Sequence, residues 1–133
     1  MTRQSRHLSV YIDRPVPEVY AFASDPANLP QWALGLGSSA VREGDDWFVE
    51  TPGGRARVTV APENEYGVLD QVVVTPSGET VYVPLRATRD GDGCEVDFTL
   101  RRAPDMTDAE FERDAALVTS DLALLKKILE GTG

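Results

Sequence analysis

The chain has 133 residues and a formal net charge of −9, from 22 acidic and 13 basic side chains. Its 41% hydrophobic and 26% charged residues are typical of a globular domain, which excludes disordered and collagen-like chains. The length predicts one domain over residues 1–133. The acidity disfavours nucleic acids and anionic membrane surfaces as partners, because both attract basic proteins.

The cysteine content and the hydropathy indicate the environment of the protein. Cys94 is the only cysteine, so the chain has no internal disulfide and no cysteine zinc cluster. No apolar run is long enough for a signal peptide or a membrane span. These features predict a cytoplasmic protein without membrane insertion.

The first 32 residues predict one strand and two short helices. Residues 7–13 alternate between apolar and polar side chains, which is typical of a half-buried strand. A helix begins after Asp13, because Pro15 suits a first helical turn, where its missing N–H costs nothing. That helix ends at Asp25-Pro26, and residues 27–32 predict the second helix.

Residues 38–102 change to the two-residue period of strands. Glycine-containing turns separate the strands, because glycine supplies the positive φ that tight hairpin turns require. The turns lie at 44–45, 53–54, 77–78 and 91–93, and the six predicted antiparallel strands cover 38–43, 46–51, 55–61, 67–75, 79–89 and 94–102.

The lengths of the hairpin loops also predict which residues face each other. Loops at 77–78, 91–92 and 53–54 predict the opposite pairs Val72–Val83, Asp70–Leu85, Leu85–Phe98, Ala87–Val96 and Trp47–Val60. With these registers most apolar side chains of the strands share one face, and a slip of one residue would scatter them.

Residues 107–130 predict a long amphipathic helix. Thr107 and Glu110 form a capping box, and acidic residues early and lysines late suit the helix dipole. Gly131 ends the helix. Its apolar stripe is formed by Phe111, Ala115, Val118, Leu122, Leu125 and Leu129, widened by Leu117, Leu124 and Ile128.

Two segments and the order of the elements resemble a known superfamily. Residues 12–22 (Ile-Asp-Arg-Pro-Val-Pro-Glu-Val-Tyr-Ala-Phe) look like its entry from strand to helix, and residues 25–32 (Asp-Pro-Ala-Asn-Leu-Pro-Gln-Trp) like its second helix. The chain is thereby similar to the START-like superfamily, also called SRPBCC or the polyketide cyclase/dehydrase family. The resemblance covers nearly the whole chain.

The resemblance implies an α+β helix-grip fold. In that fold a seven-stranded antiparallel sheet curves around the long C-terminal helix, with two short helices after the first strand. The cavity between sheet and helix holds sterols, lipids, polyketides or plant hormones in members of the superfamily. No universal catalytic residue comes with the fold, so the resemblance transfers none. With one histidine, one cysteine and no phosphate-binding motif, the sequence predicts no metal and no cofactor.

Asp70 is the first candidate for a polar group in that cavity. The predicted register puts it on the apolar face, between Val68 and Val72, where a carboxylate is costly unless it is hydrogen-bonded or paired. One interpretation is a polar anchor in the cavity with a raised pKa. The alternatives are a structural partner for an arginine, or a bulge that turns Asp70 outward.

Two further acids lie on the long helix. On an ideal helix Asp114 and Asp121 fall at roughly −40° and −60° from Val118, inside the apolar sector. They are candidates for lining the cavity. They equally suit a bond to loop backbone or an ion pair with an arginine.

The remaining candidate residues form the mouth and the walls of the predicted cavity. Trp32, Leu36 and Trp47 are candidates for the mouth, since tryptophan combines apolar area with one N–H donor. Filling of the core is the alternative role for them. The candidate wall residues are Val58, Val72, Val83, Leu85, Phe98, Phe111, Val118 and Leu122.

Three functions follow as hypotheses. The first is binding of a small, largely apolar ligand, lipid-like or polyketide-like, by a monomer or homodimer. The second is a cyclase or dehydratase that uses the cavity carboxylates as acid and base. The third is a protein-interaction module like the activators of heat-shock ATPases, which needs an exposed apolar patch such as one around Phe48 and Tyr82.

Overall fold

Strands and helices follow one another in the predicted order in a computed structural model that describes residues 4–34, 37 and 39–131. The elements are β1 (Ser5–Ile12), α1 (Val16–Ala23), the 3-10 helix η1 (Pro26–Asn28), α2 (Leu29–Trp32), β2 (Ala40–Glu43), β3 (Asp46–Thr51), β4 (Gly54–Val60), β5 (Gln71–Val74), β6 (Thr80–Val83), β7 (Leu85–Asp90), β8 (Gly93–Arg101) and α3 (Asp108–Glu130). None of the helices in these ranges has the length and hydropathy to span a membrane.

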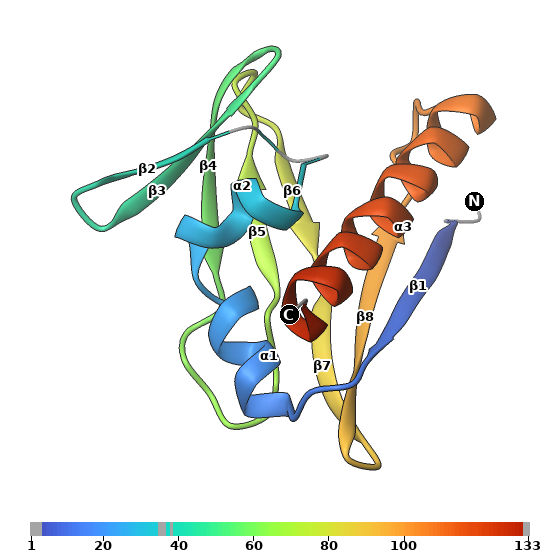
Figure 1. The fold of residues 1–133 in the computed structure, drawn as a ribbon. Helices are drawn as coiled ribbons and strands as arrows, with labels where there is room; N and C mark the ends of the chain where they lie inside the picture. Colours follow the sequence, from blue (N-terminus) through green and yellow to red (C-terminus); the bar gives the residue numbers. More distant parts are fainter. Residues whose placement is uncertain (1–3, 35–36, 38, 132–133) are drawn as a thin grey trace.

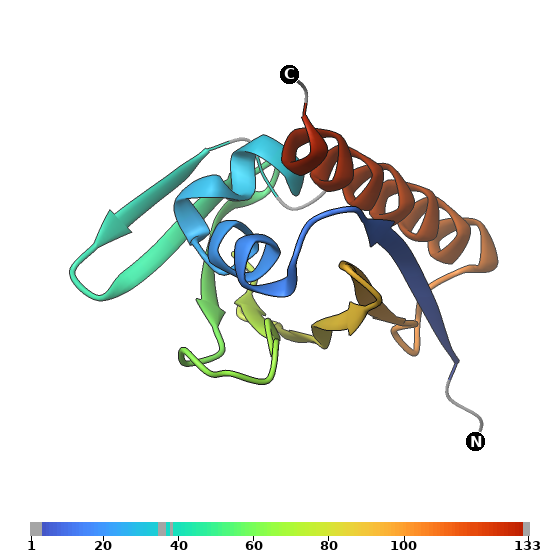
Figure 2. The ribbon, with the colours of Figure 1, turned by 60° about the horizontal axis from the view of Figure 1, so that its bottom comes forward.

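The strands form a curved antiparallel wall, and the helices lie on its concave side (Figures 1 and 2). One sheet has the order β1-β8-β7 and the other β2-β3-β4-β5-β6. The predicted α+β fold, with a curved sheet around a long C-terminal helix, is therefore confirmed. Within the described ranges there are eight strands in two sheets, however, rather than seven in one.

Pro84 explains the extra strand. A proline has no N–H to donate to a ladder, so the predicted strand 79–89 is divided into β6 and β7. The two sheets stay connected across this break. Val68 forms an isolated bridge with Arg86, and the Leu69 N–H donates to the Leu85 carbonyl at 2.8 Å.

The hairpin registers agree with the prediction in one case and differ in two. The β7–β8 pairs Leu85–Phe98 and Ala87–Val96 are as predicted. In the β3–β4 hairpin Trp47 faces Val58 rather than Val60. The turn there is Pro52-Gly53, and the shift of two residues leaves every side chain on its predicted face.

The β5–β6 hairpin differs from its predicted register by one residue. Pro76 cannot donate the hydrogen bond that a two-residue loop needs, so the Thr75 N–H donates to the Glu79 carbonyl at 2.8 Å instead. This leaves a three-residue loop with Gly78 at φ 91°. The shift exchanges the two faces of residues 68–74, because side chains alternate along a strand.

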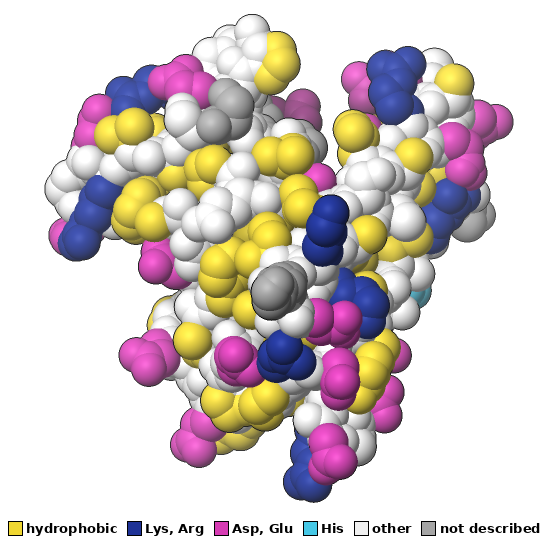
Figure 3. All heavy atoms as spheres, in the orientation of Figure 1, with side chains coloured by type: hydrophobic (Ala, Val, Ile, Leu, Met, Phe, Trp, Pro, Cys, Tyr) yellow, Lys and Arg dark blue, Asp and Glu magenta, His cyan; other side chains and the backbone are white. Residues whose placement is uncertain are grey.

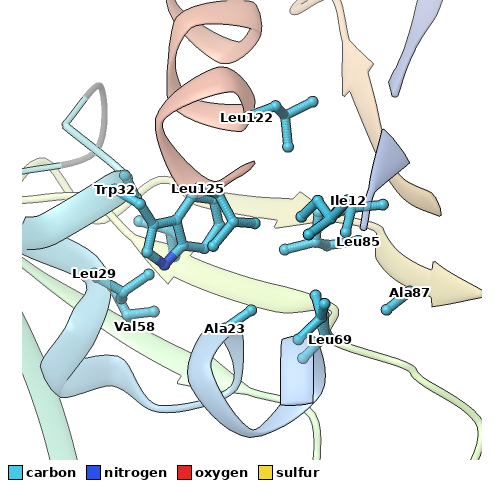
Figure 4. Close-up of a cluster of buried hydrophobic side chains, with 14 of the residues drawn as sticks. Ile12, Ala23, Leu29, Trp32, Val58, Leu69, Leu85, Ala87, Leu122 and Leu125 are labelled. Carbon is cyan, nitrogen blue, oxygen red and sulfur yellow. The ribbon is translucent and has the colours of Figure 1, made fainter. Parts of the chain in front are cut away.

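The core lies between the concave side of the sheets and the helices. Helix α3 begins with the predicted capping box of Thr107 and Glu110, and it buries Phe111, Ala115, Leu122 and Leu125. Figure 4 shows Trp32 beside Leu125 in this cluster. The other labelled members are Ile12, Ala23, Leu29, Val58, Leu69, Leu85, Ala87 and Leu122.

Candidate functional site

A cavity of about 220 Å³ lies between α3 and the concave side of the sheets. Both sheets contribute to its wall, because β5 and β6 belong to one sheet and β8 to the other. Its lining residues are Trp32 and Ala33 at the end of α2, Gln71, Val73 and Val83 from β5 and β6, Phe98 and Leu100 from β8, and Asp114, Leu117, Val118, Asp121 and Leu122 from α3.

The cavity brings half of the candidate residues together. Those in its wall are Trp32, Val83, Phe98, Asp114, Val118, Asp121 and Leu122. Val58, Leu85 and Phe111 are buried but lie outside this lining, and Trp47 is half-buried on β3. Leu36 lies outside the described residues.

Asp70 does not line the cavity, which corrects the expectation from the predicted register. Its carboxylate accepts hydrogen bonds from both the Nε and Nη2 atoms of Arg86, at 2.9 and 2.8 Å. It also accepts from the Tyr82 hydroxyl and from the Leu85 N–H, each at 2.9 Å. This is the structural arginine pair that was the alternative interpretation.

The expected raised pKa of Asp70 is also wrong. The Arg86 guanidinium, with the Leu85 N–H and the Tyr82 hydroxyl, stabilises the charged carboxylate and lowers its pKa to about 2, although burial opposes this. The bond to Asp70 raises the pKa of Tyr82 in turn. Asp70 is therefore held in its charged form at neutral pH, as the partner of Arg86.

The same one-residue shift puts Val72 on the outer face of the sheet and Gln71 on the face that lines the cavity. Val72 pairs with Tyr82 and shares the outer face with Asp70, so the expectation that it lines the cavity is wrong. Gln71 and Val73 take its place. The sequence prediction missed Gln71 because the assumed loop length put it on the outer face.

Gln71 is the least exposed of the three polar or charged residues in the described cavity wall, the others being Asp114 and Asp121. Only 6% of its surface is exposed. Its backbone is paired on both sides, with Val60 and with Val83. Its side-chain amide, however, forms no hydrogen bond with any residue in the described ranges, although it offers two donors and one acceptor group.

Asp114 connects the cavity to a second, more polar hollow. That hollow has about 340 Å³ and is lined by Glu79, Ala103, Asp105, Met106, Glu110, Arg113 and Asp114. We call it the vestibule. It lies at the N-terminal end of α3, where Figure 3 shows the surface indented between that end of the helix and the strands opposite.

Four further features bear on other chemistry. The Trp32 indole N–H is buried and without a partner in the described part of the chain. Within the same part, no group of three or more histidine, cysteine or acidic side chains is placed to hold a metal ion. His7 lies on β1 with its ring nitrogen 3.2 Å from the Thr99 hydroxyl, and burial raises the pKa of Cys94.

Comparison with solved structures identifies the fold. The structure of DynU16, from the dynemicin biosynthetic locus, matches with a TM-score of 0.69 and 19% identity over 95% of this chain. The match covers 47% of DynU16, so the chain spans about half the length of that protein. The structure of Ara h 8.0201 is a second match, with a TM-score of 0.66, 10% identity, and coverage of 98% of this chain and 100% of that chain.

A third match is the Aha1 dimer from Colwellia psychrerythraea, with a TM-score of 0.71, 13% identity, and coverage of 98% and 99%. No family model matches the sequence, and no curated protein matches it. At these identities the likeness concerns the fold. The chain has the START-like helix-grip fold that its sequence resembles.

Proposed function

We propose that this helix-grip chain binds a small, largely apolar molecule in the cavity between α3 and the sheets. The observation that carries the proposal is the composition of the cavity wall. Of the twelve lining residues that the structure describes, nine are apolar or aromatic, and the other three are Gln71, Asp114 and Asp121. Apolar walls with a few polar groups are typical of ligand sites, in which the walls provide affinity and the polar groups orientation.

The size of the cavity limits the ligand. Drug-sized ligands occupy pockets of roughly 300–1,000 Å³, whereas an apolar cavity of roughly 150 Å³ holds benzene. A cavity of about 220 Å³ therefore suits one aromatic ring with a short substituent, or an aliphatic chain of similar bulk. A longer ligand would extend past Asp114, which lines both hollows, into the vestibule.

Blocking the cavity is expected to abolish binding. Val118→Phe adds a ring to the cavity wall, whereas Ala116→Phe adds one to an exposed position on the same helix. Titration of 2-phenylethanol, followed by NMR chemical shifts, should show at least a tenfold loss of affinity for Val118→Phe and little change for Ala116→Phe. Equal binding by all three proteins would contradict the proposal, and a well-dispersed spectrum checks that each variant is folded.

Native mass spectrometry of the purified protein supplies an independent test. A mass excess that disappears under denaturing conditions would show a non-covalent ligand and begin to identify its class. The resemblance in fold to a protein from a biosynthetic locus supports a search among polyketide-like and lipid-like molecules first.

Acid–base catalysis is a second candidate function, because two carboxylates lie in the cavity wall. Asp70 no longer contributes to it. Catalysis near neutral pH requires that Asp114 or Asp121 titrate close to neutrality. Carbon-detected NMR titration of the two carboxyl groups tests this, and titration of both below pH 5 would exclude them as general acids.

The third hypothesis, an interaction surface on the outer face, stays a hypothesis. Tyr82 is 48% exposed, although its hydroxyl is bonded to Asp70. The Phe48 ring lies 4.8 Å from the Arg55 guanidinium carbon.

A further inference from the structure

We infer that the ligand of this cavity is an amphiphilic cation, with an apolar body between α3 and the sheets and a protonated amine at the mouth. The inference rests on the proposed function and adds the chemical class of the ligand. Its two grounds are the unpaired amide of Gln71 inside the cavity and the charges that surround its mouth.

The Gln71 amide indicates that the cavity accommodates a polar group. A buried amide without a hydrogen bond is unfavourable, and the great majority of buried polar groups in proteins have partners. Gln71 as a whole residue is 6% exposed, and it lines the cavity. A hydrocarbon would leave it unpaired, whereas a ligand with a hydroxyl or amine donor pairs with its carbonyl oxygen.

The charge of the mouth indicates the sign of that ligand. Among the described residues that line the cavity there is no lysine, arginine or histidine, whereas Asp114 and Asp121 are both present. The vestibule adds Glu79, Asp105 and Glu110, with Arg113 as its single basic lining residue. In the described lining of the two hollows an anionic ligand would meet five acidic side chains and one basic side chain, whereas a cation would be attracted.

Asp114 is the carboxylate best placed to pair with the amine. It belongs to both the cavity wall and the vestibule. Its side chain forms no hydrogen bond or ion pair with a residue in the described ranges, whereas Glu110 accepts from Thr107 and Asp121 already has a partner. A charge-assisted bond from an ammonium group to a half-buried carboxylate is stronger than a neutral hydrogen bond.

Three probes with the same ring separate charge from apolar binding. These are 2-phenylethylamine, a cation; 2-phenylethanol, which is neutral; and 3-phenylpropionate, an anion. We expect the protein to bind the amine about tenfold more tightly than the alcohol and to bind the carboxylate most weakly, by calorimetry or NMR titration at low salt. Added salt should reduce the difference, since it screens charges at the mouth.

Two variants assign the roles of the two residues. Asp114→Asn should remove most of the preference for the amine and leave the affinity for the alcohol unchanged. Gln71→Leu should weaken the amine and the alcohol by a similar factor of several-fold. Asp92→Asn is the matched control, because it removes the same charge from the β7–β8 turn, outside the cavity and vestibule.

The results distinguish the cationic-ligand inference from the proposed apolar binding. Equal affinity for the amine and the alcohol, or tighter binding of the carboxylate, would overturn the cationic ligand but leave apolar binding intact. If Asp92→Asn and Asp114→Asn lose the preference for the amine equally, the preference arises from the net charge of the protein. That result would overturn Asp114 as the partner of the amine. No binding of any probe to the folded protein would overturn both the inference and the proposed function.

Discussion

Replacing Asp70 by alanine is expected to lower the free energy of unfolding by about 3 kcal/mol. Asp70 is 6% exposed and accepts four hydrogen bonds, from Tyr82, Leu85 and twice from Arg86. Without it the buried Leu85 N–H has no acceptor. Arg86 is half exposed, so water partly replaces its lost partner and limits the cost. Urea unfolding at pH 7 measures the change.

The Asp70 contribution should also depend on pH. Its pKa is about 2 in the folded chain and 3.8 for an unperturbed group, so the unfolded state binds the proton more readily. The stabilisation is thus complete above about pH 4 and is lost as the pH falls towards 2. It amounts to about 2 kcal/mol. The difference in stability between the unchanged protein and Asp70→Asn should shrink between pH 5 and pH 2.5.

Asp92→Asn is the control for both measurements, because Asp92 is exposed and forms no ion pair in the described ranges. It should change the stability by less than about 0.5 kcal/mol at pH 7. A loss below about 1 kcal/mol for Asp70→Ala, or a difference independent of pH, would show that the arginine pair does not hold this part of the fold.

Gly67→Ala is expected to destabilise the protein by about 3 kcal/mol or more. Gly67 has φ 72°, where a side chain is strained, and a Cβ there would overlap the carbonyl oxygen of Ala87. The two segments cannot move apart freely, because the Ala87 N–H donates to the Gly67 carbonyl at 2.9 Å. The substitution therefore disturbs the connection between β7 and the segment before β5.

Gly44→Ala separates backbone strain from overlap. Gly44 has a similar φ of 64°, but no atom lies within 4 Å of the position that a Cβ would occupy. It should cost about 1 kcal/mol, the usual penalty for a left-handed alanine. Similar losses for the two variants in urea unfolding would mean that the Ala87 carbonyl yields to the added methyl group.

Sequence patterns predicted α3 and β8 well, for physical reasons that differ. The helical period of α3 persists over 23 residues. Each apolar residue of the buried stripe therefore gives the same orientation for Asp114 and Val118. The β7–β8 turn contains Gly91, and its closing pair Asp90–Gly93 has no proline. A two-residue loop therefore forms as predicted, and it allows only one register of the two strands.

The β5–β6 hairpin shows what the pattern lacked. Residues 72–74 are three valines in succession, so alternation gives no information about which of them faces the helix. The face then depended on the loop length, which Pro76 changed by removing a donor. That single error misplaced Asp70 and concealed Gln71. The vestibule was missed because it joins a turn, a loop and a helix end that no local period connects.

The break at Pro84 has a consequence for how the cavity can vary. Gln71 and Val83 belong to one sheet and Phe98 to the other, so the cavity spans the seam between them. Across that seam run the Val68–Arg86 bridge and the Leu69–Leu85 hydrogen bond, with Asp70 beside them. We expect substitutions at the seam to change the angle between the sheets. The capacity of the cavity would then change while its lining residues stay the same.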